Sequence, residues 1–354
     1  MATAGQVERA YLDAQRAAVL EIADQGLVSV ARLVEGGAID VAPKFQRRDR
    51  WTPDKQSSLI ESFLVNIPVP PVYLAEDEGR IGRYAVIDGK QRLTAIAAFF
   101  SDQLVLRNLT RLPSLNGVRY STMPEGVRSS LGMKNIRVTT LLRQSDEGLK
   151  HEVFLRLNTG GDVLNAQEIR NVAYRGPLND LVYNLAENEF LRAQFKVVPP
   201  ASPAYRTMTD AEFVVRFFAL ADRWEQFSGD IRLTLDSYMS DNRAPSDAEL
   251  QRLRRTFENA ISVAEAIWGH DAFKWPGRDQ GLAGLFDAQM IAIAELGTNR
   301  HKDLLAHAAA IRASTDALFQ EPEFEESVRR ATNTPSRLRF RVERLQAAIV
   351  RVTG

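Results

Sequence analysis

The residue types best suited to chemistry stand together in the pentapeptide DGKQR at positions 88–92. Its lysine and arginine carry positive charge, its glutamine adds a neutral donor and acceptor, and its aspartate can accept hydrogen bonds. Such a set suits the binding of a phosphate or a carboxylate. The alternative is a capped helix whose basic residues face water, and for an isolated pentapeptide that is the better interpretation.

The elements around this pentapeptide predict how it is held. Residues 84–87, YAVI, are β-branched and aromatic and predict a buried strand, and helical spacing of apolar residues runs from Leu93 to Phe100. Between them we expect Asp88 to be the helix N-cap and Gly89 to form a turn that a Cβ would obstruct. The helix would then offer unpaired N–H groups and the positive end of its dipole to an anion.

A second basic segment, PKFQRRDRW, precedes this corner at residues 43–51. Its four cations are interleaved with Phe45 and followed by Trp51, a pattern that suits stacking on a base together with phosphate contact. The alternative is a solvated loop anchored by two buried aromatic side chains, and composition alone does not separate the two.

A third candidate lies at residues 158–170, where the turn NTGG is followed by Glu168 and Arg170. A turn without bulky side chains could approach a ligand through its backbone. It could equally be a helix–turn–helix corner in which Asn158 caps and Glu168 pairs with Arg170 or a neighbour.

Four boxes together resemble a known family. DGKQRLTAI at 88–96 is similar to the DGQQR box of a bacterial family with a ParB/sulfiredoxin-like N-terminal domain, found in GmrSD-type restriction systems. FQRRDRW at 45–51, NIPVPPVYL at 66–74 and FLRLNTGGDVLNAQEIRN at 154–171 resemble its other boxes, in the same order. Lys90 stands where many relatives have glutamine, which adds a charge and favours phosphate contact over hydrogen-bond reading of a base or ribose.

The resemblance implies a nucleoside triphosphate near the DGQQR corner, which some relatives hydrolyse. Carried onto this sequence, it makes Asp88, Gln91 and Arg92 the candidate catalytic residues, with Asp88 also the candidate ligand of Mg²⁺. The candidate nucleotide-binding residues are Gln46, Arg47, Gly89, Lys90, Arg92, Thr94, Asn158, Gly160 and Arg170.

The function implied is a nucleotide-binding, NTP-hydrolysing component of an anti-phage or modified-DNA restriction system. Some relatives carry an HNH-like nuclease domain, and no such signature follows residue 270, so we expect a separately encoded nuclease as partner. Two alternatives stay open. One is a nucleotide- or DNA-binding regulator without turnover, and the other is a weak ParB-like nuclease with Asp88 and Glu168 around a metal. A homo-oligomer is compatible with the sequence.

Composition sets limits on these functions. The 354 residues are 45% apolar and 25% charged, as in ordinary globular proteins, and 45 basic against 45 acidic residues argue against a surface that grips nucleic acid throughout. The absence of cysteine excludes disulfides and thiolate metal sites and fits a cytoplasmic protein, and no apolar run predicts a membrane span or signal peptide. Neither a P-loop nor a histidine pattern typical of zinc is present.

The hydrophobic patterns predict an α+β protein: a small ParB/sulfiredoxin-like mixed sheet domain, residues 1–176, followed by an all-helical domain, residues 177–354. In the first we expect a helix over 6–24 that includes Ile22, a helix from Pro53 with a buried stripe to Ile67, and short strands within 103–123. Further strands are predicted at 39–41, 72–74, 84–87 and 136–142, and further helices at 29–35 and 124–131.

The second domain shows helical periodicity over 178–195, 209–224, 247–268, 282–296, 302–318 and 336–350. Thr209 and Glu212 form a T-x-x-E capping box. In the last helix Arg337, Arg341 and Arg344 share one face. This row is interpreted as a solvated face, with contact to nucleic acid or a partner as the alternative.

Overall fold

The computed structural model describes residues 3–17, 19–41, 51–77, 80–145, 153, 165–199 and 202–354. Contacts group the chain into two compact units, Met1–Leu164 and Asn165–Gly354, which are described separately below. The domain boundary predicted after residue 176 stays a prediction.

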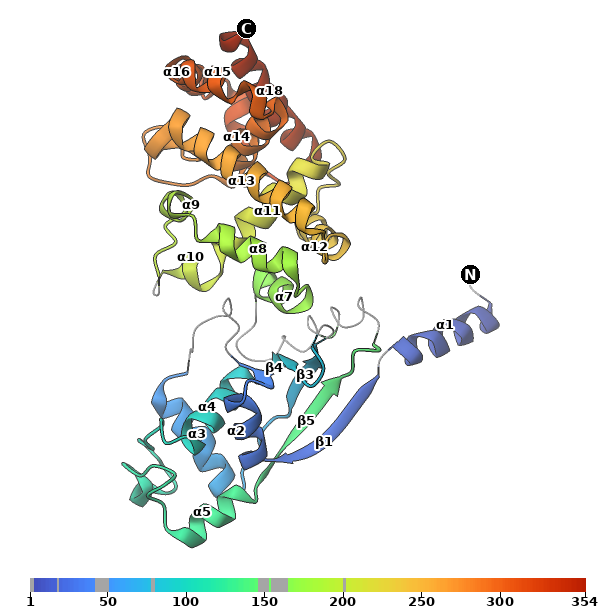
Figure 1. Ribbon diagram of the computed structural model, residues 1–354, viewed down its shortest axis with the longest axis vertical. Coiled ribbons are helices and arrows are strands. Elements are labelled where there is room, and N and C mark those ends of the chain that lie inside the picture. The colour runs from blue at the N-terminus through green and yellow to red at the C-terminus, as the bar shows by residue number, and fades with distance from the viewer. Residues whose placement is uncertain are drawn as a thin grey trace. The chain divides into compact units, whose positions relative to one another are not determined.

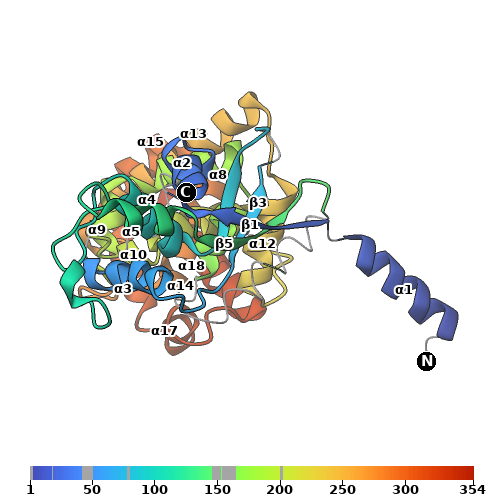
Figure 2. The same cartoon turned by 90° about the horizontal axis from the view of Figure 1, so that it is seen from below.

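The first unit contains a mixed five-stranded sheet with the order β1-β5-β3-β4-β2. The strands are β1 (Leu20–Gly26), β2 (Ile39–Asp40), β3 (Val72–Glu76), β4 (Tyr84–Asp88) and β5 (Asn135–Leu141). Strand β5 runs antiparallel to β1 and parallel to β3, whereas β4 runs antiparallel to β3 and parallel to β2. Strands β1, β5 and β3 lie side by side in both views (Figures 1 and 2). The predicted mixed sheet is confirmed.

Helices cover this sheet and form the core with it (Figure 1). They are α2 (Leu27–Glu35), α3 (Pro53–Leu64), α4 (Lys90–Phe100) and α5 (Glu125–Gly132), with a short 3₁₀ turn, η1, at Pro113–Leu115. Helix α1 (Ala4–Ala17) precedes the sheet in the chain, and its described side chains are exposed. Helix α4 lies between α2 and α3 and packs on both. Its Leu93, Ile96 and Phe99 are completely buried, so the helix that follows the DGKQR corner is held by the core of the unit.

Helix α3 begins as predicted but ends earlier. Thr52 is its N-cap, with Oγ1 accepting from the amide of Lys55 at 3.4 Å, and Pro53 is its first residue. The helix stops at Leu64, and Asn66 takes a left-handed conformation with φ 60°. Ile67, expected in the buried stripe, is therefore exposed at the surface.

Two further expectations for this unit are wrong. The helix predicted over 6–24 ends at Ala17, because Leu20–Gly26 instead form an edge strand with seven residue pairs to β5, where Ile22 points to solvent. Edge pairing outweighs the helical periodicity of this stretch. No strand forms within residues 103–123, all of which are described; loops and η1 take their place.

The second unit is helical, as predicted. Its helices are α7 (Ala166–Ala173), α8 (Pro177–Ala186), α9 (Glu189–Gln194), α10 (Pro203–Arg206), α11 (Thr209–Arg223), α12 (Ile231–Asp241), α13 (Asp247–Trp268), α14 (Ala283–Leu296), α15 (His301–Ala306), α16 (Ala308–Leu318), α17 (Pro322–Arg329) and α18 (Pro335–Thr353), with 3₁₀ turns η2 (Gly269–Asp271) and η3 (Thr298–Arg300). Helix α14 is buried from Gly284 to Ile293 and packs against α11, α13 and α18 (Figure 1). It is the central element of this unit.

The capping box predicted at Thr209 is wrong. Met208, with φ 57°, occupies the N-cap position of α11, and no side chain caps the helix. Thr209 is already the first helical residue, so it is one position too late to be a cap. Glu212 instead places a carboxylate oxygen 3.7 Å from Nη1 of Arg170.

The arginine row on α18 is also not a solvated face. Arg341 is 0% exposed and its Nη2 donates to the carboxylate of Asp287 in α14 at 2.5 Å. Arg344 pairs with Glu321 at 2.5 Å, and Arg337 with Glu326 at 3.4 Å. Because helices α14 and α17 pack beside α18, this face lies inside the unit at Arg341.

No helix in the described part of the chain is both long enough and apolar enough to cross a membrane.

Candidate functional site

The DGKQR corner joins the end of β4 to the start of α4. Gly89 is the N-cap residue and has φ 97°, a conformation that side chains rarely adopt. A Cβ at this position would come within 2.8 Å of Cγ2 of Val72 and 3.2 Å of Nη2 of Arg92. The turn therefore requires glycine for two reasons, its backbone conformation and the close approach of β3.

A β-bulge lies next to this corner. Tyr73 pairs with Asp88, but Leu74 pairs with Val86, so Ile87 is an extra residue in β4. Bulges bend a strand and redirect the side chains that follow, and they are common beside functional sites. Here the extra residue directly precedes Asp88, the last residue of β4.

Asp88 does not take the N-cap role predicted for it. Its Oδ1 accepts from the adjacent amide of Gly89 at 2.7 Å, and its Oδ2 accepts from Nη2 of Arg92 at 2.8 Å. The cap position belongs to Gly89, and no described side chain caps the first turn of α4. Hence no capping side chain takes up the N–H groups at the positive end of this helix.

Arg92 connects the corner to the proline-rich segment before β3. Its Nη1 donates to the carbonyl oxygen of Pro70 at 3.0 Å, and its side chain is 11% exposed, against 34% for Asp88. Arg92 therefore fixes the corner in place, with its charge balanced by Asp88. Sequence reasoning missed Pro70, because its contact is made by a backbone carbonyl and no residue type signals that.

Gln91 connects the corner to Trp51, the last residue of the second basic segment (residues 43–51). Its Oε1 accepts from the amide of Trp51 at 3.3 Å, and the ammonium of Lys55 lies 4.8 Å from the centre of the Trp51 ring. The end of that segment is thus anchored at the corner. Gln46 and Arg47, predicted to bind nucleotide, lie outside the described residues.

Lys90 and Thr94 complete the described part of the corner. Both are half-buried and lie one helical turn apart on α4. Oγ1 of Thr94 is buried and has no hydrogen-bond partner among the described residues, although a helical threonine can bond the carbonyl four residues earlier. This hydroxyl is a polar group that a ligand could satisfy.

Arg170 lies in the second unit and has internal partners. It is 2% exposed, and its Nε donates to Asp236 at 2.7 Å and its Nη1 to Gln167 at 3.2 Å. Neighbouring Glu168 forms a capping box with Asn165, with bonds of 2.8 and 2.9 Å. The described contacts of both residues stabilise α7 and its neighbours.

The family box at residues 154–171 contains two other candidate residues, Asn158 and Gly160, which lie outside the described residues. Among the residues that the structure describes, no group of three or more histidine, aspartate or glutamate side chains could enclose a metal ion. The corner itself contributes one carboxylate, that of Asp88.

Comparison with protein families matches part of this chain to a family model. The model of the GmrSD restriction endonuclease N-terminal domain matches residues 30–175, which include the sheet from β2 to β5 and the whole DGKQR corner. The comparisons with curated proteins and with solved structures give no match.

Proposed function

Residues 30–175 belong to the GmrSD restriction endonuclease N-terminal domain family, and from this we propose that the DGKQR corner binds a nucleoside triphosphate within a restriction or phage-defence system. The observation that carries the proposal is the helix start itself. Helix α4 begins at a positive-φ glycine, without a capping side chain, and its first residue is a lysine. This is the arrangement by which helix N-termini hold phosphate groups.

In this proposal each part of the corner has a separate task. The first-turn amides of α4 and the ammonium of Lys90 bind phosphate oxygens, and the close fit at Gly89 lets the backbone approach them. The hydroxyl of Thr94 donates to the ligand. Gln46, Arg47, Asn158 and Gly160 would contact the nucleotide from the family's other boxes.

Mg²⁺ fits this donor set only together with a nucleotide. Magnesium in nucleotide sites is held by one or two carboxylates and by the phosphates, and Asp88 can be one such carboxylate. The ion would neutralise charge on the phosphates. Arg170 would have to give up its ion pair with Asp236 to bind a phosphate. Its role in nucleotide binding therefore stays a prediction.

A second candidate function is nucleotide binding without turnover. The observation in its favour is that the three candidate catalytic side chains already have partners: Asp88 with Arg92, and Gln91 with the amide of Trp51. Hydrolysis would require at least one of them to change partner. A regulator that binds nucleotide and controls a separately encoded nuclease needs no such change.

Calorimetric titration of ATP, GTP, CTP and UTP in the presence of Mg²⁺ tests the site. We expect binding of at least one nucleotide to the full chain, weakened about tenfold by Lys90→Ala through loss of a charge-assisted contact. The double variant Lys90→Ala/Arg92→Ala should abolish binding. Arg111→Ala, which removes an exposed cation of the same unit without a side-chain contact in the described structure, is the charge-matched control and should bind normally.

Release of inorganic phosphate then separates the two functions. Turnover that Asp88→Asn and Arg92→Ala abolish supports the enzyme, whereas tight binding without release supports the regulator. Nicking of a plasmid that depends on Asp88 would instead favour the ParB-like nuclease. Equal affinity of Lys90→Ala and the unaltered chain for every nucleotide would contradict a phosphate site at this corner.

A further inference from the structure

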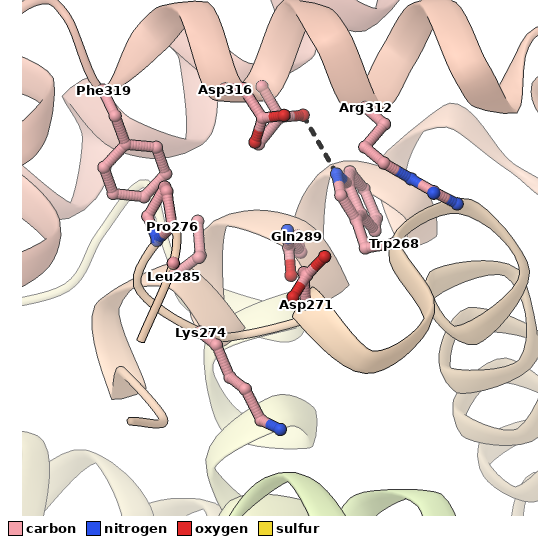
Figure 3. A pocket seen from close by; sticks show the side chains of 11 residues that line it. Trp268, Asp271, Lys274, Pro276, Leu285, Gln289, Arg312, Asp316 and Phe319 are labelled. Atoms are coloured by element: carbon pink, nitrogen blue, oxygen red, sulfur yellow. Dashed lines mark hydrogen bonds between the residues drawn. The ribbon is translucent and has the colours of Figure 1, made fainter. Parts of the chain in front are cut away.

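A second candidate site lies wholly within the helical unit. A pocket of about 130 Å³ opens between the end of α13, the turn η2 and helices α14 and α16 (Figure 3). Among the residues that line it are Trp268, Asp271, Leu285, Gln289, Asp316 and Phe319. It contains none of the residues assigned above to the nucleotide.

Gln289 presents an unpartnered donor to this pocket. The residue is 1% exposed, and its Oε1 accepts from the amide of Phe273 at 2.8 Å. Because an amide N–H can only donate, that bond fixes Oε1 on the Phe273 side and turns Nε2 toward the pocket (Figure 3). Nε2 is buried without a hydrogen-bond partner in the described structure. A buried donor without a partner costs free energy, and an acceptor oxygen on a ligand would remove that cost.

Two carboxylates, Asp271 and Asp316, line the pocket (Figure 3). Both residues are exposed, which places them at its mouth. No described cation lies within ion-pair distance of Asp316, and Asp271 has only an exposed contact of 3.4 Å to Nδ1 of His270. Partial burial raises the pKa of Asp316, and the charge of Asp271 raises this pKa further, against the opposing effect of Arg312. Because both carboxylates line the same pocket, a cation bound there would be stabilised by two negative charges.

The cations near the pocket are engaged elsewhere. Nζ of Lys274 lies 2.8 Å from Asp279, and hydrogen bonds from Lys274 and Lys196 lower the pKa of Asp279 to about 2. Nε and Nη2 of Arg312 donate to the carbonyl oxygen of Ile267 at 2.8 and 2.6 Å. In Figure 3 both side chains extend away from the pocket. Neither one forms an ion pair with the carboxylates at the mouth of the pocket.

Apolar side chains form the rest of the wall. Leu285 and the rings of Trp268 and Phe319 line the pocket, and Nε1 of Trp268 already donates to Oγ1 of Thr315 at 3.0 Å. The indole ring therefore offers an apolar surface with its polar edge satisfied. Aromatic rings beside carboxylates suit a planar organic cation with an apolar stem.

We propose that this pocket binds an alkylguanidinium that also carries a carbonyl oxygen, as an arginine does. The guanidinium pairs with Asp271 and Asp316, the stem packs on Trp268, and the carbonyl oxygen accepts from Nε2 of Gln289. A cavity of about 150 Å³ holds a guest the size of benzene, so the guanidinium and part of its stem fill the volume. The same carboxylates repel phosphate groups, which argues against a nucleic acid here.

The indole N–H resonances of the full chain provide the test, since the sequence has 4 tryptophans and Trp268→Phe assigns the relevant one. We expect Nα-acetyl-arginine methylamide to shift the Trp268 resonance saturably. The citrulline analogue, a neutral isostere, should not. Asp316→Asn should weaken binding about tenfold or more by removing a charged hydrogen-bond partner. Glu343→Gln, which removes an exposed carboxylate from α18, is the matched control and should bind as the unaltered chain does.

The remaining arms identify the source of the ligand. Tighter binding of the capped arginine than of free arginine indicates an arginine within a polypeptide, and the reverse order indicates a small molecule; either result supports the proposal. Agmatine, which lacks the carbonyl, should bind more weakly than both. Equal binding of the citrulline probe, unchanged affinity of Asp316→Asn, or no shift at saturating probe would overturn it.

Discussion

Both units contain an aspartate–arginine pair, and the two pairs differ in access to solvent. Asp88 and Arg92 sit one turn apart at the start of α4, with side chains 34% and 11% exposed. Asp287 lies on α14 between Arg216 of α11 and Arg341 of α18, with side chains 1%, 8% and 0% exposed. The first pair borders a helix N-terminus, whereas the second joins three packed helices.

This difference separates a pair that can exchange partners from one that cannot. Asp88 is partly exposed and Arg92 keeps its bond to Pro70, so separating this pair costs less than separating a fully buried one. Removing Asp287 would leave two arginines in the interior without a counter-charge, a much larger cost. Identical side-chain chemistry therefore serves a candidate binding site in one unit and the stability of the helical core in the other.

Replacing the two aspartates is the direct test of this comparison. We expect Asp287→Asn to lower the free energy of unfolding by about 3 to 5 kcal/mol, because it leaves buried charge uncompensated. Asp88→Asn should lower it by about 1 kcal/mol or less. Calorimetric unfolding of the two variants measures both values. Equal losses would show that Asp88 and Arg92 are as much a structural pair as Asp287 and Arg341.

Gly89→Ala tests whether the turn at the corner requires glycine, both for stability and for nucleotide binding. We expect a loss of about 1 to 3 kcal/mol from the positive φ, together with loss of nucleotide binding as the Cβ displaces Val72. Gly82→Ala is the matched control, since Gly82 has φ 73° but nothing within 4 Å of its Cβ position. Normal nucleotide affinity in Gly89→Ala would contradict the close backbone approach proposed for the phosphates. Urea unfolding and calorimetric titration give the two readouts.

Glu61 shows how the first unit buries a charge without a cation. Its carboxylate accepts from the amides of Arg111 and Leu112 at 2.7 and 2.9 Å and from the amide and hydroxyl of Thr110, both at 3.3 Å. Burial alone would raise the pKa of Glu61, but these hydrogen bonds outweigh it and lower the pKa below the usual 4.5.

A lowered carboxyl pKa in the folded state adds stability at neutral pH that is lost as the pH falls from about 4.5 through the folded-state value. We expect Glu61→Gln to cost about 1 to 2 kcal/mol at pH 7 and to flatten the acid side of the melting-temperature profile. Thermal melts at stepped pH values, with Glu343→Gln as control, measure this. A variant as acid-sensitive as the unaltered chain would show that Glu61 is not the group responsible.

The smallest effect is expected at the surface of the second unit. Arg223 pairs with Asp241 at 2.9 Å, and both side chains are exposed. Asp241→Asn should change the free energy of unfolding by less than about 1 kcal/mol and the effect should fade with added salt. A cost approaching that of Asp287→Asn would mean that burial does not explain the difference between the pairs.

Local signals were sufficient for much of the fold. Helix α13 spans Asp247–Trp268 as its periodicity predicted, and Thr52 with Pro53 starts α3 through a bond that a capping hydroxyl makes within its own helix. These features depend on contacts between residues a few positions apart. The mixed sheet followed by helices was predicted on the same grounds together with the family resemblance.

Expectations that depended on distant contacts were less successful. Ile22 keeps helical spacing with Val7 and Tyr11 but belongs to an edge strand, because β5, over a hundred residues away, pairs with it. The arginine row of α18 has the pattern of a solvated face, yet Asp287 and the packing of α17 enclose Arg341. Charge patterning identifies the residues that share a face but not what packs against it.

For the candidate site, the sequence by itself determined the strand, the glycine turn and the helix start that bring DGKQR to one corner. Backbone propensity and spacing within about ten residues decide these elements. Only the tertiary structure decided that Asp88 pairs with Arg92 rather than capping the helix, that Pro70 and Trp51 anchor the corner, and that Arg341 is buried. The physical reason is that a charged side chain takes its role from the groups that folding brings within a few ångströms of it, and those groups are far away in the chain.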